Sequence, residues 1–411
     1  GPTKAMQVYA NPVPNKQYTP PPASFYQYQS LDTERTTATD IQVTYIGAWS
    51  NEAKSAFEYA ASIWESQIDS SVPIKIQVEF STLPSGVLGG AGWTSLHRDF
   101  SGAPVTSTWY PASLANALSQ SDRNGSTVSE IGAEFAVNAS WYFGTDGNTP
   151  SNKFDFVTVV LHEIGHGLGF SDSMDVNGSI GSWGYTSGGT FPIIYDRFVD
   201  NGGGTLLIDG FPNNSAALAS QLTSNNLYFD GTNANSANGG QVRLYAPNPW
   251  EQGSSIAHLN LTTFLGTPNS LMTPAVSPGE AQHNPGSITL GILQDMGWQL
   301  MNEAPVISDL PVIFVQSGSN KDNAIDLWQY VNDADSSDSE LTYKIIAESN
   351  SDAGATIDSN RFLDINPVPV NWEGRTTLTI EITDPDNHSS QASVTVISGD
   401  ISTVYLPFTA R

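Results

Sequence analysis

The sequence predicts two domains of different class: an α+β domain with a twisted mixed sheet and long helices, followed by an all-β sandwich. The first observation is length, because 411 residues at about 150 residues per domain suggest two or three domains. The second is that β-branched runs and helical periodicity alternate through residues 41–303. The third is that only short strand-like runs separated by Asp, Asn, Ser and Gly follow residue 303.

The predicted α+β domain begins with a strand, a helix and a second strand. Residues 41–46 are rich in β-branched side chains and predict the first strand. Ser50 is a good N-cap for the helix that follows. Its apolar residues recur every three or four positions and are Ala53, Phe57, Ala60, Trp64 and Ile68. Residues 74–80 alternate strictly between apolar and polar and predict the second strand.

The rest of this domain holds the segments around the most informative motif. Residues 133–138 predict a later strand, which we expect at the edge of the sheet. Residues 154–170 predict a second helix, and residues 288–300 a last one. Between them, residues 171–257 are rich in Gly, Asn and Ser, so we expect a largely irregular insertion with some hairpins.

The two ends of the chain have a different character. Residues 1–40 are rich in Pro, Tyr, Gln and Thr and predict an extended arm, for which a pro-segment is one interpretation. Residues 304–398 predict the β-sandwich, with strand-like runs at 312–315, 324–328, 341–346, 376–382 and 392–397. This segment resembles the Ig-like or cadherin-like modules of secreted bacterial enzymes. Residues 399–411 form a tail, either a strand or a sorting signal.

Composition excludes several functional classes. With 15 Lys and Arg against 41 Asp and Glu, the net charge is −26, which argues against nucleic acid or an anionic membrane as a partner. The absence of cysteine excludes disulfides, Cys-ligated zinc and thiol catalysis, so any metal must use His, Asp or Glu. The sequence contains no run of 18 apolar residues and therefore predicts no transmembrane helix. The Thr/Ser/Asn/Gly-rich, Lys-poor composition predicts a secreted or cell-surface protein of bacterial origin.

The strongest motif is His162-Glu163-Ile164-Gly165-His166 within the predicted helix 154–170. On a helix, His162 and His166 project from one face one turn apart, so both imidazoles can reach one zinc ion at about 2.1 Å. Glu163 would lie beside a water at the ion and act as general base. The motif therefore predicts a zinc site with a catalytic carboxylate.

Two flanking features make the chain resemble the metzincin zinc peptidases. Gly169 follows His166 by three residues, as at the glycine where the metzincin helix ends. Met272, in Ser270-Leu271-Met272-Thr273-Pro274, resembles the Met-turn methionine. The resemblance implies that Met272 forms an apolar floor under the ligands without binding the ion.

Two residues are candidates for the third ligand. Asp172 stands six residues after His166, where most metzincins have a His and some, of the snapalysin type, an Asp. His258 precedes Met272 by 14 residues and follows a Gly/Ser-containing stretch. This layout, with a long insertion before the third histidine, resembles leishmanolysin. We favour His258, since imidazole is the commonest ligand, and keep Asp172 as the alternative.

The chain departs from leishmanolysin in its lack of cysteine. That family is rich in disulfides and caps its zinc with a pro-segment cysteine. Latency here would have to come from another ligand or from sequestration of the site.

Other residues carry weaker predictions. His97 is expected on the surface or behind the ligands, His283 as a loop residue or a lining of the substrate cleft, and His388 in a solvated turn. Calcium is a possible second, structural cofactor, because acidic turns supply hard oxygen ligands. These turns are Asp146-Gly147-Asn148, the group Asp172, Asp175 and Asn177, and residues 332–335.

The sequence thus predicts a secreted zinc endopeptidase acting on a protein or peptide substrate, with His162, His166 and His258 as ligands and Glu163 as base. The alternative is an adhesive surface protein that binds glycans or proteins and whose zinc is structural. A structural site needs no glutamate beside the first histidine and usually closes all four coordination positions, which favours the enzyme.

Overall fold

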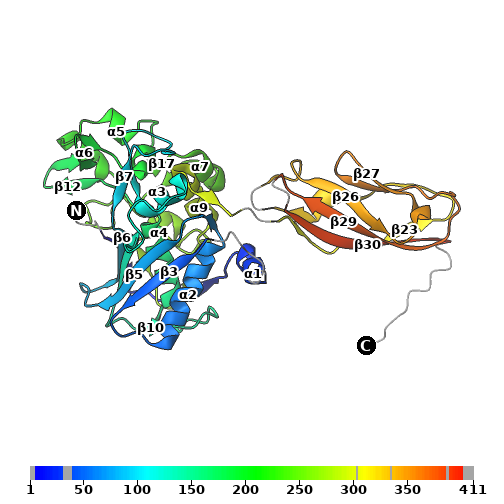
Figure 1. The fold of residues 1–411 in the computed structure, drawn as a ribbon, viewed down its shortest axis with the longest axis horizontal. Coiled ribbons are helices and arrows are strands. Elements are labelled where there is room, and N and C mark those ends of the chain that lie inside the picture. The colour runs from blue at the N-terminus through cyan, green and yellow to red at the C-terminus, as the bar shows by residue number, and fades with distance from the viewer. Residues whose placement is uncertain (1–4, 31–38, 302–303, 334–335, 386–387, 401–411) are drawn as a thin grey trace. The chain divides into compact units, whose positions relative to one another are not determined.

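The computed structural model describes residues 5–30, 39–301, 304–333, 336–385 and 388–400. The chain divides into two compact units, Gly1–Met301 and Asn302–Arg411. The first mixes helices and strands, whereas the second is built from strands (Figure 1). In the described part of the chain, no helix combines the length and the apolar character that a membrane span requires.

A six-stranded sheet forms the centre of the first unit, in the order β19-β1-β6-β9-β5-β3. In that order the strands are Ala275–Val276, Met6–Ala10, Val87–Trp93, Ile131–Ala136, Ile74–Ser81 and Ile41–Ile46. β3, β5 and β9 run parallel to one another. β6 is antiparallel to both of its neighbours, β9 and β1, and β1 is parallel to β19.

Two expectations about this sheet were wrong. The strand predicted at 133–138 does not lie at an edge, because β9 has β5 on one side and β6 on the other. The arm predicted at residues 1–40 is not separate where the structure describes it, because β1 is an internal strand of the sheet and β2 (Gln17–Thr19) pairs with β20 (Glu280–Gln282). Helix α1 (Ala23–Ser30) follows β2.

Two helices lie where the apolar periodicity of the sequence predicts them. The helix after Ser50 is confirmed as α2 (Asn51–Glu65), and the Ser50 side chain accepts a hydrogen bond from Ala53 N–H. The second helix is α4 (Phe156–Gly167), all of whose residues are buried. α4 packs against α2 and against the sheet strands β6, β9 and β1 (Figure 1). Trp64 of α2 ties the two together, because its indole N–H donates to the Leu161 carbonyl over 3.0 Å.

The remaining elements of this unit are short. The predicted last helix is α9 (Ser287–Met296), which ends before the expected residue 300. The other helices are α3 Ala112–Ser119, η1 Ile194–Phe198, α5 Leu207–Gly210, α6 Ala216–Leu222, α7 Thr232–Asn238 and α8 Leu261–Phe264. The insertion 171–257 holds the expected hairpins, and also α5, α6 and α7, which were not expected. The small strands are β4 Ile68–Asp69, β7 Leu96–Arg98, β8 Trp109–Pro111, β10 Trp141–Tyr142, β11 Phe154–Asp155, β12 Asp175–Asn177, β13 Ile180–Ser182, β14 Tyr185–Thr186, β15 Thr190–Phe191, β16 Val199–Asp200, β17 Tyr228–Phe229, β18 Val242–Arg243 and β21 Gln299–Leu300.

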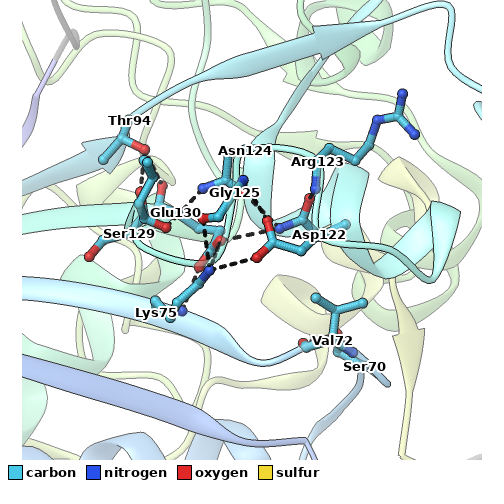
Figure 2. Close-up of polar contacts among 12 residues, drawn as sticks. Ser70, Val72, Lys75, Thr94, Asp122, Arg123, Asn124, Gly125, Ser129 and Glu130 are labelled. Atoms are coloured by element: carbon cyan, nitrogen blue, oxygen red, sulfur yellow. Dashed lines mark hydrogen bonds and ion pairs between the residues drawn. The ribbon is translucent and has the colours of Figure 1, made fainter.

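A polar cluster fixes the loop before β9 to strand β5 (Figure 2). The buried Glu130 carboxylate accepts hydrogen bonds from Lys75 N–H over 2.6 Å and from the Asn116 amide over 3.2 Å. The Lys75 ammonium lies 3.4 Å from Glu130 and 2.9 Å from Asp122. The buried carboxylate thus has a cation, one backbone N–H and one side-chain amide as partners, so the cluster satisfies its charge without a ligand.

The second unit has two main sheets that share one hydrophobic core, the arrangement of a β-sandwich. One sheet has the order β23-β30-β29-β26 and the other β24-β28-β27. The elements are β22 Val306–Ile307, β23 Ile313–Gln316, β24 Lys321–Asp326, η2 Leu327–Gln329, β25 Val331–Asn332, β26 Thr342–Glu348, η3 Ser351–Ala353, β27 Ala355–Asp358, β28 Phe362–Ile365, β29 Gly374–Thr383 and β30 Ser389–Gly399. Most of the predicted tail, from residue 401 on, lies outside the described residues.

Candidate metal centre

The N-terminus of α4 is fixed by a buried carboxylate. Asp155 is the N-cap and accepts hydrogen bonds from the Thr158 N–H over 2.8 Å and the Thr158 hydroxyl over 2.7 Å. The Thr149 hydroxyl donates to its other oxygen over 2.7 Å. His283 Nε2 lies 2.8 Å from the same carboxylate and is fully buried. His283 therefore supports the start of the helix, and its position is not that of a cleft residue.

The C-terminus of α4 turns sharply at a glycine. Gly169 has φ of 120°, a conformation that L side chains rarely adopt. The turn is closed by Phe170 N–H, which donates to the Gly165 carbonyl over 3.1 Å, and by the Trp298 indole, which donates to Leu168 over 2.8 Å. The helix ends three residues before the predicted residue 170 because this turn interrupts it.

The structure brings together the three histidines His162, His166 and His258, all fully buried. Their Nε2 atoms lie 2.9 Å apart for His162 and His166, 3.1 Å for His166 and His258, and 3.2 Å for His162 and His258. Nitrogens that each stand about 2.1 Å from one ion at tetrahedral angles lie roughly 3.4 Å apart, so the observed triangle is close to that of a three-histidine site.

The other nitrogen of each ring is held by a backbone carbonyl. His162 Nδ1 lies 2.6 Å from Leu271 O, His166 Nδ1 lies 2.7 Å from Phe170 O, and His258 Nδ1 lies 2.7 Å from Ser254 O. A carbonyl can only accept, so each Nδ1 must carry the proton and each Nε2 must present a lone pair. Three lone pairs directed at one point repel one another unless a cation lies between them. The donor set therefore fits zinc.

The pKa shifts of the three histidines also fit a metal site. Burial lowers the pKa of His162 to about 4, and burial together with the neighbouring rings lowers the pKa values of His166 and His258 well below 6.5. The rings are therefore neutral at physiological pH, which is the form that binds a metal.

Glu163 lies beside the cluster and is fully buried. Burial raises its pKa well above 4.5, the charge of Glu134 raises it further, and the nearby backbone N–H of Val8 opposes the rise. Within the described residues, neither carboxylate oxygen makes a hydrogen bond of normal geometry. Strand β6 leaves room for this side chain, because a Cβ on Gly89 would stand 2.8 Å from Glu163 Oε1.

Met272 lies under the helix that carries the histidines. A Cβ on Gly165 would stand 2.8 Å from the Met272 sulfur, so the side chain packs directly on the helix backbone. The turn around it is closed by Thr273 N–H, which donates to Ser270 O over 3.0 Å. The preceding carbonyl, Leu271 O, is the acceptor for His162. The turn thus positions one ligand and supports the helix.

The alternative ligand Asp172 is buried but lies outside this group of three. Its carboxylate accepts a hydrogen bond from Met174 N–H over 2.6 Å. The geometry therefore favours His258 over Asp172 as the third member of the site.

No second group of three or more ligand-type side chains comes together in the part of the chain that the structure describes. Asp146 instead accepts hydrogen bonds from Tyr142 and Asn148. Asp172 and Asp175 belong to no such group, and residues 334–335 lie outside the described residues. Calcium at these turns stays a prediction.

The last two histidines lie away from the centre. His97 is on β7, half buried. His388 is half exposed and lies 3.2 Å from Asp384.

Sequence reasoning missed two neighbours of Glu163, namely Val8 on β1 and Gly89 on β6. The available indication for Val8 was the apolar alternation of Met6 and Val8.

Comparison with known proteins gives limited matches. A family model described as SPBPB7E8-like matches residues 105–179, which include α4 but not His258. No curated protein matches the chain. The human Desmocollin-1 ectodomain is 15% identical over 23% of this chain and 20% of that chain, with a TM-score of 0.20. Cadherin domains 1–4 of protocadherin gamma B7 are 19% identical over 24% of this chain and 25% of that chain, with a TM-score of 0.18. The chain thus spans a quarter or less of these structures, and such TM-scores do not assign its fold.

Proposed function

We propose that this protein is a secreted or cell-surface, bacterial zinc endopeptidase related to the metzincins and resembling leishmanolysin, with Ig-like or cadherin-like character in its second unit. The observation that carries the proposal is the convergence of the Nε2 atoms of His162, His166 and His258, each ring fixed through Nδ1. The unpaired, buried carboxylate of Glu163 beside them gives the centre a group that a purely structural site does not require.

His162, His166 and His258 would hold the zinc ion through Nε2. When bound there, zinc supplies Lewis acidity, which polarises a peptide carbonyl and lowers the pKa of water. Glu163 takes a proton from the water that adds to the carbonyl carbon. It then delivers that proton to the amide nitrogen as the C–N bond breaks, leaving a carboxylate and an amine.

The rest of the centre orients these groups. The carbonyls of Leu271, Phe170 and Ser254 fix the ring planes of the ligands. Met272 supports α4 from below and has no ligand role. The apolar surroundings exclude water, which strengthens the electrostatic interactions among the groups.

The experiment measures bound zinc and the cleavage of a quenched fluorescent peptide library. We expect one zinc per chain, loss of that zinc in His258→Ala, and its retention in Asp172→Ala. Glu163→Gln should keep zinc and fold but lose at least about 100-fold in cleavage. The matched control is Glu52→Gln, at an exposed position in the first turn of α2.

The outcomes separate this proposal from an adhesive protein with a structural zinc. Cleavage that persists in Glu163→Gln removes the assigned base. Zinc binding without any cleavage would favour the adhesive alternative. The assay is done on the intact chain and on a chain cut near the exposed Val13, which releases the segment before it. The second unit, built from strands, is compatible with an adhesive role.

A further inference from the structure

The strand that covers the histidine cluster comes from the first residues of this sequence. β1 lies between β6 and β19, and β19 directly follows the Met272 turn. It runs antiparallel to β6, with Val8 opposite Gly89, and parallel to β19, with Tyr9 opposite Ala275. An extended peptide therefore already occupies the space between the two walls that flank α4.

Hydrogen bonds from the β1 backbone hold this segment on both sides. Gln7 N–H donates to Gly253 O over 2.9 Å, and Tyr9 N–H donates to Pro274 O over 2.9 Å. Ala10 N–H donates to Gly86 O over 2.7 Å. All three acceptors are backbone carbonyls, so an unrelated extended peptide could use them equally well.

The segment also contacts the groups of the proposed chemistry. Met6 and Val8 are fully buried. Val8 pairs with Gly89, and a Cβ on Gly89 would stand 2.8 Å from Glu163 Oε1. Ser254 links the strand to the ligands, because its carbonyl holds His258 while its hydroxyl lies 3.4 Å from the Gln7 carbonyl oxygen. The Gln7–Val8 peptide thus lies beside Ser254, which orients His258, and beside Gly89, which faces Glu163.

Glycines on the groove walls allow this close approach. A Cβ on Gly90 would stand 3.2 Å from Met6 O, and a Cβ on Gly253 would stand 3.2 Å from Ala5 O. Gly253 also has φ of 81°. Walls without side chains at these points bring the occupant's backbone close to the wall backbone, so the groove selects an extended main chain.

The segment is attached to the rest of the unit through an exposed bend. Val13 is 65% exposed and lies between two prolines, whereas beyond it β2 pairs with β20 and Phe25 is buried. The segment 5–11 is therefore held separately from the part that follows the bend.

We propose that residues 5–11 form an inhibitory strand that fills the peptide groove between β6 and β19, so that substrate enters only after this strand leaves. The proposal rests on the proposed peptidase function and adds its regulation. It supplies, without cysteine, the sequestration of the site. The groove accepts an extended peptide with apolar side chains at the positions of Met6 and Val8.

The test converts the intramolecular strand into a separate peptide. A recognition sequence for a site-specific protease is inserted after Val13, and the purified chain is cut there without removing the fragment. In the intact chain the strand stays bound at any dilution, whereas in the cut chain it dissociates as the protein is diluted. We expect the activity per molecule to rise at least tenfold on dilution of the cut chain and to stay constant for the intact chain.

Two variants give an independent measurement in the uncut protein. Tyr9→Pro removes the N–H that donates to Pro274 and should raise cleavage. Val13→Pro is the matched control, since its N–H only donates to Asn11 within the exposed bend, and it should change nothing. Equal activity of intact, cut and Tyr9→Pro chains, all with full zinc, overturns the inhibitory strand and leaves the peptidase function standing.

A labelled synthetic peptide of residues 5–11 separates the two ideas further. It should bind the diluted cut chain and inhibit cleavage competitively, whereas the same peptide N-methylated at Tyr9 should bind at least tenfold more weakly. Binding by the zinc-loaded cut chain that cleaves no library peptide supports the groove and its occupant but contradicts the peptidase function. Failure of the peptide to bind contradicts the inhibitory strand.

Discussion

Gly165 and Met272 are in direct contact: a Cβ on Gly165 would stand 2.8 Å from the Met272 sulfur and 3.2 Å from its methyl carbon. Residue 165 lies between the two histidines of α4, so the contact fixes the height of the helix above the Met272 turn. The same turn provides the carbonyl that orients His162. One packing contact therefore sets the position of two ligands relative to the third.

Gly165→Ala tests this contact. Glycine to alanine in a helix interior normally stabilises by about 1 kcal/mol, so the sign of the change is informative. We expect destabilisation by about 1–3 kcal/mol instead, because the buried methionine has little room to move. Thermal unfolding and zinc affinity measure the effect. If the contact causes the loss, Gly165→Ala should cost less in a Met272→Ala background than in the wild type. A stabilised single variant would contradict the interpretation.

Gly89→Ala tests the space around the proposed base. The added Cβ would stand 2.8 Å from Glu163 Oε1 and 3.2 Å from Val159 Cγ1, so the carboxylate must shift. A shift of about 1 Å in a catalytic group can cost roughly 100-fold in rate, while zinc binding should remain. Steady-state cleavage and metal content are measured on the diluted chain cut after Val13. Gly132→Ala on β9 is the control, because its Cβ meets only a Thr94 atom at 4.0 Å; equal losses in both variants would sink the interpretation.

Asp155→Ala tests the buried start of α4. The substitution removes the helix cap and leaves His283 without the carboxylate that lies 2.8 Å from it. We expect a loss of about 2–4 kcal/mol in the free energy of unfolding, above the roughly 1 kcal/mol of an ordinary cap. Urea denaturation measures it. Ser215→Ala, which removes the cap of α6, is the comparison, and a similar small loss in both would argue against the special role of Asp155.

Asp196 predicts a pH dependence of stability. Burial raises its pKa to about 7, the charge of Asp172 adds to the rise, and hydrogen bonds from Ser173 and Ile193 oppose it. Because the folded pKa lies above the unfolded value of 3.8, the native state keeps a proton that the unfolded state has lost between these values. Its contribution to stability is fully present below pH 3.8 and is lost as the pH rises through about 7.

The measurement compares unfolding free energies from pH 4 to 8. One proton corresponds to a fall of about 1.4 kcal/mol per pH unit within the window, and Asp196→Asn should remove that component of the slope. Asp209→Asn, at an exposed position, should leave the slope unchanged. The assignment fails if the wild-type slope survives in Asp196→Asn.

Local patterns were enough to predict several elements. The helix after Ser50 shows apolar spacing and a cap at the same time, and α2 begins where both indicate. The spacing of His162 and His166 places both on one helix face, and the structure joins them to His258 from 92 residues later. That third position came from a family resemblance, because no local pattern in the sequence relates His258 to the helix.

The missed features depend on contacts that sequence patterns do not encode. β6 contains Gly89, Gly90 and Gly92, which lower strand propensity, so the strand between β9 and β1 was not expected. Because β6 was not expected, nothing in the sequence indicated a neighbour on that side of β9, and residues 133–138 were predicted at the edge of the sheet. β1 stands beside a proline-rich stretch that indicated an arm, and only its pairing with β6 and β19 makes it part of the sheet.

The pairing of Tyr9 with Ala275 has a consequence for biosynthesis. Residues 6–10 are synthesised before their parallel partner β19, which is made only after nearly all of the intervening unit. Contacts so distant in sequence form late, because a long loop must close before they stabilise the chain. The nascent unit therefore builds α2, α4 and β3, β5 and β9 first, and closing the sheet over the histidines is a concluding step of folding.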